Sequence, residues 1–533
     1  MALQTGLPDK LEKQAIARSM ETLVTAVLAD LVCRAISFTV DRCCHQQRKR
    51  CVEDTTQRLH HVLLRVQTVV EEADRRCVTN RAMLRQLQLM REGVYRGYYL
   101  LSAFKRQGPV NDTAQDREVS HHGHSSFALS QFNPAKRLCT ISAWTTTRAN
   151  MAPQDTTREG EAELQEVLTV LERMASDMKE LVVFLSSYPP TRREPRSGHL
   201  WLENRMFGRD AEQERIINFL LEPEPAHAEY LGVLPVIGRA RIGKSTLVEH
   251  VCLDERVRNH FSLIVFLAES DTKDGEQSPH LGDNAIIKHQ DLGSAGKSLV
   301  VIELAGDVDE STWWRRTLPA LRARRTTPVS KIIVTSRSEK IAGFGTTQAL
   351  ELKPLPREAY WYFFKTIAFG STDAMDEPEL ESICMEMADL LNGSFVAANL
   401  FGGYLRANLC PQFWQKVLKG YRHYASMHLN LFGEHQSDSL ANGRPIYMWR
   451  LPKTDAMLIA YGCYQACSAQ QHDLPMTTME EVQIGSTRPR GDFQAVAWRS
   501  NIPPYYSYLL NCGVQASSSL IRTPRRNKKL RHR

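Results

Sequence analysis

Residues 231–249 carry a pattern that is suited to holding a nucleotide phosphate. They read LGVLPVIGRARIGKSTLVE, which is an apolar run, a G-x-x-x-x-G-K-S segment and a helix-compatible run. Gly238 and Gly243 allow the tight turn that points backbone N–H groups at phosphate oxygens. Lys244 has the length to reach the β- and γ-phosphates, and the Ser245 hydroxyl is suited to Mg²⁺. The pattern predicts a phosphate-binding loop between a strand and a helix; a chance glycine turn is the less favoured interpretation.

The segments that must position this loop predict an α/β domain with a parallel sheet. Apolar runs at 261–267, 298–304 and 331–336 are strand candidates, and helical segments lie between most of them. Residues 356–420 are typical of helices. Residues 421–510 are rich in Tyr, Trp and Met with weak periodicity, and no fold can be assigned to them.

The N-terminal part predicts an all-α bundle. Apolar residues recur at helical spacing over residues 14–105, with a charged break at 46–54, and a further amphipathic helix is predicted at 159–187. The predicted domain limits are 1–105 for the helical bundle, 106–200 for a linker with one amphipathic helix, 201–350 for the P-loop domain, 351–420 for a small helical domain, 421–510 for the unassigned region and 511–533 for a basic tail.

Composition describes an ordinary intracellular protein. The 533 residues carry a formal net charge of +7, and the twelve cysteines show no CxxC pair or metal-ligand spacing. No signal peptide or membrane-spanning run is predicted, so we expect a cytoplasmic protein. The basic residues after 521 fit a solvated end, with a nuclear-import signal as the alternative. Nucleic-acid binding is not expected, because no recognition helix or aromatic–basic interleaving is visible.

The order of motifs resembles a known family. FGRD, GRARIGKST, SLVVIEL, KIIVTSR and LNGSFVAA follow a helical bundle, and this order is similar to the NB-ARC module of plant disease-resistance proteins of the coiled-coil class. The resemblance covers about residues 10–410 and is clearest from Phe207 to Arg337. It implies a Rossmann-like nucleotide domain that acts as an ADP/ATP switch, in which ADP holds a resting form and ATP permits oligomerisation and signalling.

The resemblance also implies roles for single residues. Phe207 would lie near the adenine, and Arg337 would be the sensor arginine that reads the γ-phosphate. Mg²⁺ would be held by Ser245 and Glu303. The residues that would wrap the phosphates are Gly238, Arg239, Ala240, Arg241, Ile242, Gly243, Lys244, Ser245 and Thr246.

Several residues depart from the family pattern. Leu304 stands where the family has the acid that positions the attacking water, so we expect no efficient hydrolysis. Ala240 and Arg241 occupy glycine positions, which would cost roughly 1–2 kcal/mol each where φ is positive. Phe395 replaces the proline of the GLPL loop. Residues 98–102 lack the acids of the family's EDVID patch, which is consistent with the absence of a leucine-rich period of 20–29 residues.

Three functions remain open. The leading hypothesis is a truncated, divergent immune-receptor-like switch or adaptor that binds ADP or ATP with Mg²⁺ and contacts protein partners, including further copies of itself, through its helical N-terminus. The second is a nucleotide-free scaffold or decoy with a relic P-loop. The third is an active P-loop ATPase, for which Asp307 or Asp309 would have to replace the missing acid. The partner, the trigger and the oligomeric state cannot be derived from the residues.

Overall fold

The computed structural model describes most of the chain in detail. The described residues are 8–76, 78–107, 153–189, 206–223, 231–268, 286–289, 297–304, 329–441, 444–451, 456–466, 475–500 and 506–516. The chain divides into two compact units, residues 1–66 with 122–176 and residues 67–121 with 177–533. Asp307, Asp309 and the charged end of the basic tail lie outside the described residues.

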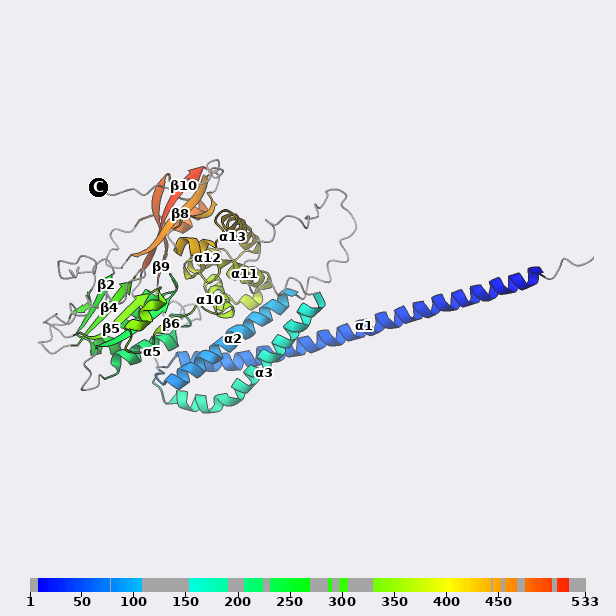
Figure 1. Ribbon diagram of the computed structural model, residues 1–533, viewed down its shortest axis with the longest axis horizontal. Coiled ribbons are helices and arrows are strands. Elements are labelled where there is room, and N and C mark those ends of the chain that lie inside the picture. Colours follow the sequence, from blue (N-terminus) through cyan, green and yellow to red (C-terminus); the bar gives the residue numbers. More distant parts are fainter. Residues whose placement is uncertain are drawn as a thin grey trace, which may run out of the picture. The chain divides into compact units, whose positions relative to one another are not determined.

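The helices predicted for the N-terminal part are present, but their boundaries differ. They are α1 (Pro8–Asp74), α2 (Arg81–Gln107) and α3 (Pro153–Ser186) (Figure 1). The predicted break at 46–54 is wrong, because α1 runs through it. That segment contains neither glycine nor proline, so its charged residues interrupt the apolar stripe without interrupting the helix.

Ion pairs join α1 to α3 within the first unit. Arg48 Nε lies 2.7 Å from Glu161 Oε1, and Arg58 Nη2 lies 2.7 Å from Glu172 Oε1. Both pairs are partly exposed, so each contributes little to stability. Within the described residues, no helix combines the length and the apolar character that crossing a membrane requires.

A six-stranded sheet forms the centre of the α/β part of the second unit. Its order is β3-β2-β4-β5-β1-β6, and every neighbouring pair is parallel except β2 and β3. The P-loop strand and the three strand candidates after it are confirmed, whereas the short edge strands were not predicted. The strands are β1 (Gly232–Gly238), β2 (Leu263–Ala268), β3 (Ile286–His289), β4 (Ser298–Leu304), β5 (Val329–Ser336) and β6 (Leu350–Leu352).

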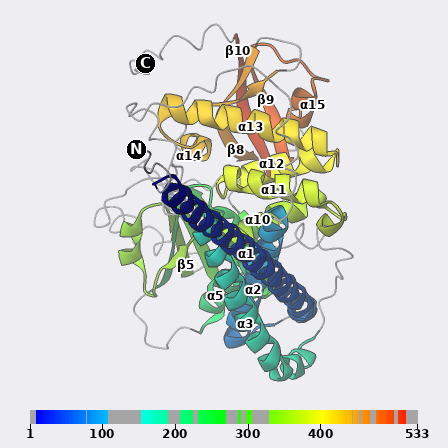
Figure 2. The same ribbon diagram turned by 90° about the vertical axis from the view of Figure 1, so that its right-hand side faces the viewer.

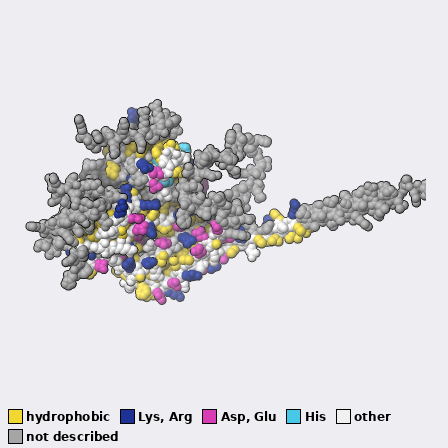
Figure 3. Space-filling view, viewed as in Figure 1, with side chains coloured by type: hydrophobic (Ala, Val, Ile, Leu, Met, Phe, Trp, Pro, Cys, Tyr) yellow, Lys and Arg dark blue, Asp and Glu magenta, His cyan; other side chains and the backbone are white. Residues whose placement is uncertain are grey.

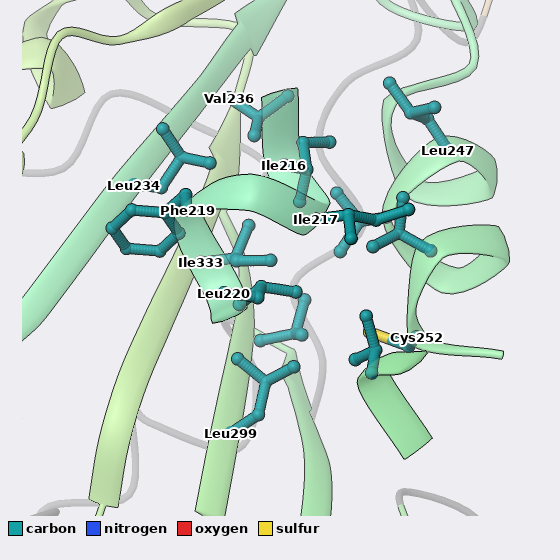
Figure 4. Close-up of a cluster of buried hydrophobic side chains, with 14 of the residues drawn as sticks. Ile216, Ile217, Phe219, Leu220, Leu234, Val236, Leu247, Cys252, Leu299 and Ile333 are labelled. Atoms are coloured by element: carbon teal, nitrogen blue, oxygen red, sulfur yellow. The ribbon is translucent and has the colours of Figure 1, made fainter. Parts of the chain in front are cut away.

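Both faces of this sheet are buried, as is typical of parallel sheets. One face packs against the helices α5 (Asp210–Leu221), α6 (Lys244–Cys252) and α7 (Glu255–His260). Figure 4 shows part of this cluster, in which Leu234, Leu299 and Ile333 of the sheet meet side chains of α5 and α6. The alternate residues of the same strands pack on the other face against the short 3₁₀ helix η3 (Glu339–Phe344).

The helical segment predicted over 356–420 is confirmed and continues further than expected. Its elements are α10 (Arg357–Phe369), the 3₁₀ turn η4 (Ala374–Asp376), α11 (Pro378–Leu391), α12 (Phe395–Arg406) and α13 (Pro411–Phe432). Asn392 and Gly393 have positive φ and end α11, and the Ser394 hydroxyl caps α12 by accepting from Ala397 N.

The region that could not be assigned from sequence contains a four-stranded antiparallel sheet, which lies beside α12 and α13 (Figures 1 and 2). Its elements are α14 (Gln436–Ala441), β7 (Ile446–Arg450), β8 (Ala456–Ala466), α15 (Met479–Ile484), β9 (Asp492–Arg499) and β10 (Ser507–Ala516), and the strand order is β7-β8-β10-β9. Leu400 of α12 packs into the core of this sheet. Because β10 ends at Ala516, it extends into the range predicted for the basic tail.

Candidate functional site

The parallel sheet brings the predicted site residues to one edge. Ile237 of β1 pairs with Ser336 of β5, and Glu303 of β4 pairs with Thr335, so the carboxyl ends of the three strands lie at one level. The P-loop follows β1 and Arg337 follows β5. Ligands of open α/β sheets bind at this carboxyl edge.

The two P-loop glycines are required for different reasons. A Cβ atom at position 238 would lie 2.9 Å from the carbonyl oxygen of Leu352 in β6, so only glycine fits this close approach. Gly243 has φ +94° and supplies the left-handed turn before α6. Arg241 also has a positive φ, at +59°, whereas Ala240 is not among the described residues with positive φ. The expected backbone strain is therefore confined to Arg241.

Lys244 is held by the loop that it follows. Its Nζ donates to the carbonyl oxygens of Gly238 at 2.7 Å and Arg239 at 2.8 Å, and only 8% of the residue is exposed. Burial and the nearby Arg337 lower the pKa of Lys244 to about 8, while Glu303 acts in the opposite direction. The ammonium group remains mostly protonated at neutral pH, as phosphate binding requires.

Ser245 and Glu303 form an oxygen pair beside the loop. The Ser245 hydroxyl donates to Glu303 Oε1 at 2.7 Å, which places two hard oxygen ligands of the kind that Mg²⁺ prefers next to each other. Leu304 points to the opposite face of the sheet, where it is 2% exposed in the apolar cluster around η3. Adjacent strand residues alternate between faces, so the side chains of Leu304 and Glu303 lie on opposite faces of the sheet.

A cavity of about 790 Å³ lies at this edge, within the usual range of ligand pockets. Among the predicted site residues, the following line it: Phe207, Ala240, Arg241, Ile242, Gly243, Lys244, Ser245, Thr246, Glu303 and Arg337. Gly238 and Arg239 are not in the lining and contribute the carbonyls that hold Lys244. The charged lining residues are Arg209, Arg241, Lys244, Arg337, Arg406 and Arg499, against Glu303 and Glu480. This excess of cations favours an anionic ligand.

Aromatic side chains form another part of the lining. Phe207 is 4% exposed, and its ring lies 5.4 Å from that of Phe363. Phe363 in turn contacts Phe395 edge-on, with ring centroids 5.3 Å apart. All three residues line the cavity, so Phe395, which replaces the family's proline, is placed where an aromatic ring can contact a bound base.

Sequence reasoning missed the residues that the C-terminal sheet adds to this lining. They include Cys463, Trp498, Arg499 and Tyr508 of its strands, together with Glu480 of the adjoining helix α15. The richness of residues 421–510 in Tyr and Trp was the available signal, but no local spacing tied it to the P-loop. The binding roles of all these residues remain predictions.

Charged side chains of both signs lie on the surface. Among the side chains that are coloured in Figure 3, basic and acidic groups are interspersed on the face shown.

The chain matches no protein-family model, but it is similar to curated plant proteins. It is 25% identical to Disease resistance protein RGA2 of Solanum bulbocastanum over 387 residues. This aligned stretch is 68% of this chain and 36% of that protein. Putative disease resistance protein RGA4 of the same species is 30% identical over 42% of this chain and 23% of its own length. Putative disease resistance RPP13-like protein 1 of Arabidopsis thaliana is 23% identical over 70% of this chain and 35% of its own length. The matches thus span about a third or less of these relatives.

Proposed function

We propose that this chain, which is similar to plant disease-resistance proteins, is a nucleotide-binding switch or adaptor of the NB-ARC type in plant immune signalling. Its ligand would be ADP or ATP with Mg²⁺. The observation that carries the proposal is the Ser245–Glu303 oxygen pair beside Lys244, at the carboxyl edge of a parallel sheet and in a cavity whose charged lining residues are mostly cations.

Each group has a defined task in this proposal. The loop N–H groups, Lys244 and Arg337 would bind the phosphates, and Ser245 and Glu303 would hold Mg²⁺. When bound, Mg²⁺ would neutralise part of the phosphate charge. Phe207 and Phe395 would contact the base, because both line the cavity.

The proposal includes weak or absent hydrolysis. Orientation of water by a general base is typically worth about 10²–10⁴-fold in rate, and the Leu304 side chain has no group that could supply it. An active ATPase remains the alternative that depends on Asp307 or Asp309.

The remaining parts of the proposal concern protein partners and the cellular compartment. We propose action in the cytoplasm through protein contacts of the N-terminal helices, including contacts with a second copy. The relatives' names support a defence role, whereas the proposed protein contacts of the N-terminal helices and the proposed self-association rest on the family resemblance alone. Nuclear entry through the basic tail gains no support from the described residues.

The first experiment is to denature freshly purified protein and identify released nucleotide by chromatography. Wild type is expected to release close to one equivalent of ADP or ATP, and Lys244→Ala is expected to release little, because it loses the cation that contacts the phosphates. Lys353→Ala is the matched control, since Lys353 is exposed and does not line the cavity.

The outcomes separate the alternatives. Equal nucleotide content in wild type and Lys244→Ala would show that the site assignment is wrong. A wild-type protein that is empty and fails to bind added ADP or ATP would favour the scaffold. Release of phosphate over many turnovers from wild type would favour the ATPase.

A further inference from the structure

A cluster of exposed thiols lies on α1, in the first unit. Cys33, Cys43, Cys44 and Cys51 are all exposed and form no disulfide. The described cysteines of the second unit, in contrast, are buried or half-buried. Neither the P-loop pattern nor the related proteins' names assign a role to the thiols of α1.

Three of these thiols share one face of the helix. Cys44 follows Cys33 by 11 residues and Cys51 follows Cys44 by seven, which are about three and about two turns of 3.6 residues. At 1.5 Å per residue, the neighbouring Cα atoms of this row are about 16 and about 10 Å apart, whereas a disulfide requires about 4.4–6.8 Å. Cys43 and Cys44 are adjacent on the helix and therefore point about 100° apart. The row cannot form disulfides within one chain.

Apolar side chains continue this face between the first two thiols. Ile36 and Val40 precede Cys44 by eight and four residues, which places them on the same side of the helix. They are 56% and 52% exposed, and Figure 3 shows hydrophobic side chains along the described start of α1. The face therefore combines exposed aliphatic groups with nucleophilic thiols.

Basic side chains lie on the opposite side of the same stretch. Residues 42–52 contain four Lys or Arg residues and no Asp or Glu. Arg42 and Lys49 are exposed, and each precedes a thiol of the row by two residues, which is about half a turn. Arg48 is held by Glu161 of α3. A helix with one apolar face and one basic face is suited to lie on an anionic membrane surface.

We propose that Cys44 and Cys51 are S-acylation sites, and that the acylated face of α1 attaches the first unit to an anionic membrane. Exposed cysteines of amphipathic helices are typical sites of this modification. The thiolate attacks the carbonyl carbon of a long-chain acyl-coenzyme A, a thioester forms to Sγ, and coenzyme A leaves as a thiol that carries the cysteine's proton.

Two signals act together in this proposal. A single acyl chain gives only reversible membrane binding, and a basic segment beside it makes the attachment stable. The cations of residues 42–52 supply that second signal. The inference goes beyond the proposed function and shares with it only the cytoplasmic location.

The test is metabolic labelling of the full chain in plant cells with an alkyne analogue of palmitate. Wild type is expected to carry label that neutral hydroxylamine removes, because hydroxylamine cleaves thioesters. The double variant Cys44→Ser with Cys51→Ser is expected to lose most of the label and to move from the membrane pellet to the soluble fraction. Cys43→Ser is the matched control, because Cys43 is exposed but points away from the row.

A second readout isolates the basic face. Purified, unacylated full chain is mixed with vesicles of phosphatidylserine and phosphatidylcholine and sedimented. Arg42→Gln and Lys49→Gln are each expected to lower vesicle binding about fivefold, the effect of removing one cation near an anionic surface. Arg65→Gln is the control, since Arg65 is exposed on the same helix outside the basic stretch.

The outcomes separate this inference from the nucleotide site. It would be overturned by a wild type without hydroxylamine-sensitive label, or by equal loss of label in Cys43→Ser and in the double variant. Unlabelled chains joined by disulfides through Cys44 or Cys51 would also overturn it, because the face would then belong to a second copy. Nucleotide content that still depends on Lys244 would in each case leave the proposed function standing.

Discussion

At the scale of single residues, Arg241 shows how the P-loop departs from its usual composition at an energetic cost. Its φ of +59° lies in the left-handed region that glycine adopts freely. This conformation costs an L-residue with a side chain roughly 1–2 kcal/mol of free energy. The Arg241–Cys463 hydrogen bond offsets part of that cost and links the strained residue to the C-terminal sheet.

This reasoning predicts an order of stability for two replacements. Arg241→Gly and Arg241→Ala both lose the guanidinium, but only the alanine keeps the strained Cβ. We expect the glycine variant to be more stable by about 1 kcal/mol, after its larger unfolded-state entropy is deducted. The midpoints of chemical denaturation of the two proteins give the comparison. An alanine variant that equals or exceeds the glycine variant would mean that Arg241 is not strained.

The site residues differ in how well the sequence could predict them. Gly238, Gly243, Lys244 and Ser245 follow from one local spacing, because phosphate binding imposes it. Glu303 could be placed only through the resemblance, as the counterpart of a family acid; the pairing of β4 with β5 brings it to the carboxyl edge of the sheet. Trp498 and Tyr508 carry no such signal: they reach the cavity only through the pairing of β9 with β10, which weak periodicity does not reveal.

At the scale of elements, the sequence predicts that α2 is a helix, but it does not predict which elements α2 packs against. Arg91 of α2 is 7% exposed; it binds Asp74 near the end of α1 and lies 2.9 Å from Asp210 at the start of α5. Burial acts to lower the pKa of Arg91, but Asp210 and Asp74 outweigh it and the net shift is upward. Tyr99 of α2, in the segment that lacks the family's acidic patch, contacts Trp361 of α10 edge-on.

Removal of Arg91 is expected to loosen α2. Arg91→Ala leaves two partly buried carboxylates without their cation, and breaking a buried pair in this way costs about 3–5 kcal/mol. Limited proteolysis within α2 should therefore accelerate, and the denaturation midpoint should fall. Arg85→Ala is the control, because Arg85 lies on an exposed face of the same helix. Equal behaviour of the two variants would show that Arg91 does not fasten α2.

Some helix and strand predictions made from apolar periodicity and charge were wrong or missing. The charged segment at 46–54 was predicted to break a helix, yet α1 continues through it, since polarity alone does not stop a helix without glycine or proline. The short strands β3 and β6 were missed because three or four residues carry too little periodicity.

At the scale of the whole molecule, the candidate site lies within one of the two units. All residues that line the cavity belong to the unit formed by residues 67–121 and 177–533. The same unit contains α2, whose Tyr95 contacts the cavity residue Phe207 with ring centroids 5.2 Å apart. A ligand that binds only the folded state therefore stabilises this unit directly, by about 2.7 kcal/mol at a hundredfold excess over its Kd.

Hydrogen exchange resolved by peptide can test this division. Saturating ADP is expected to slow exchange in α2, α6 and β10, which belong to the unit that contains the cavity. Peptides from 32–66 of α1 and 159–176 of α3, which belong to the other unit, should exchange at the same rate with and without ADP. Lys244→Ala should abolish the protection everywhere. Equal protection of both units by ADP would instead show that they unfold as one cooperative body, with nucleotide binding coupled to the α1–α3 pair.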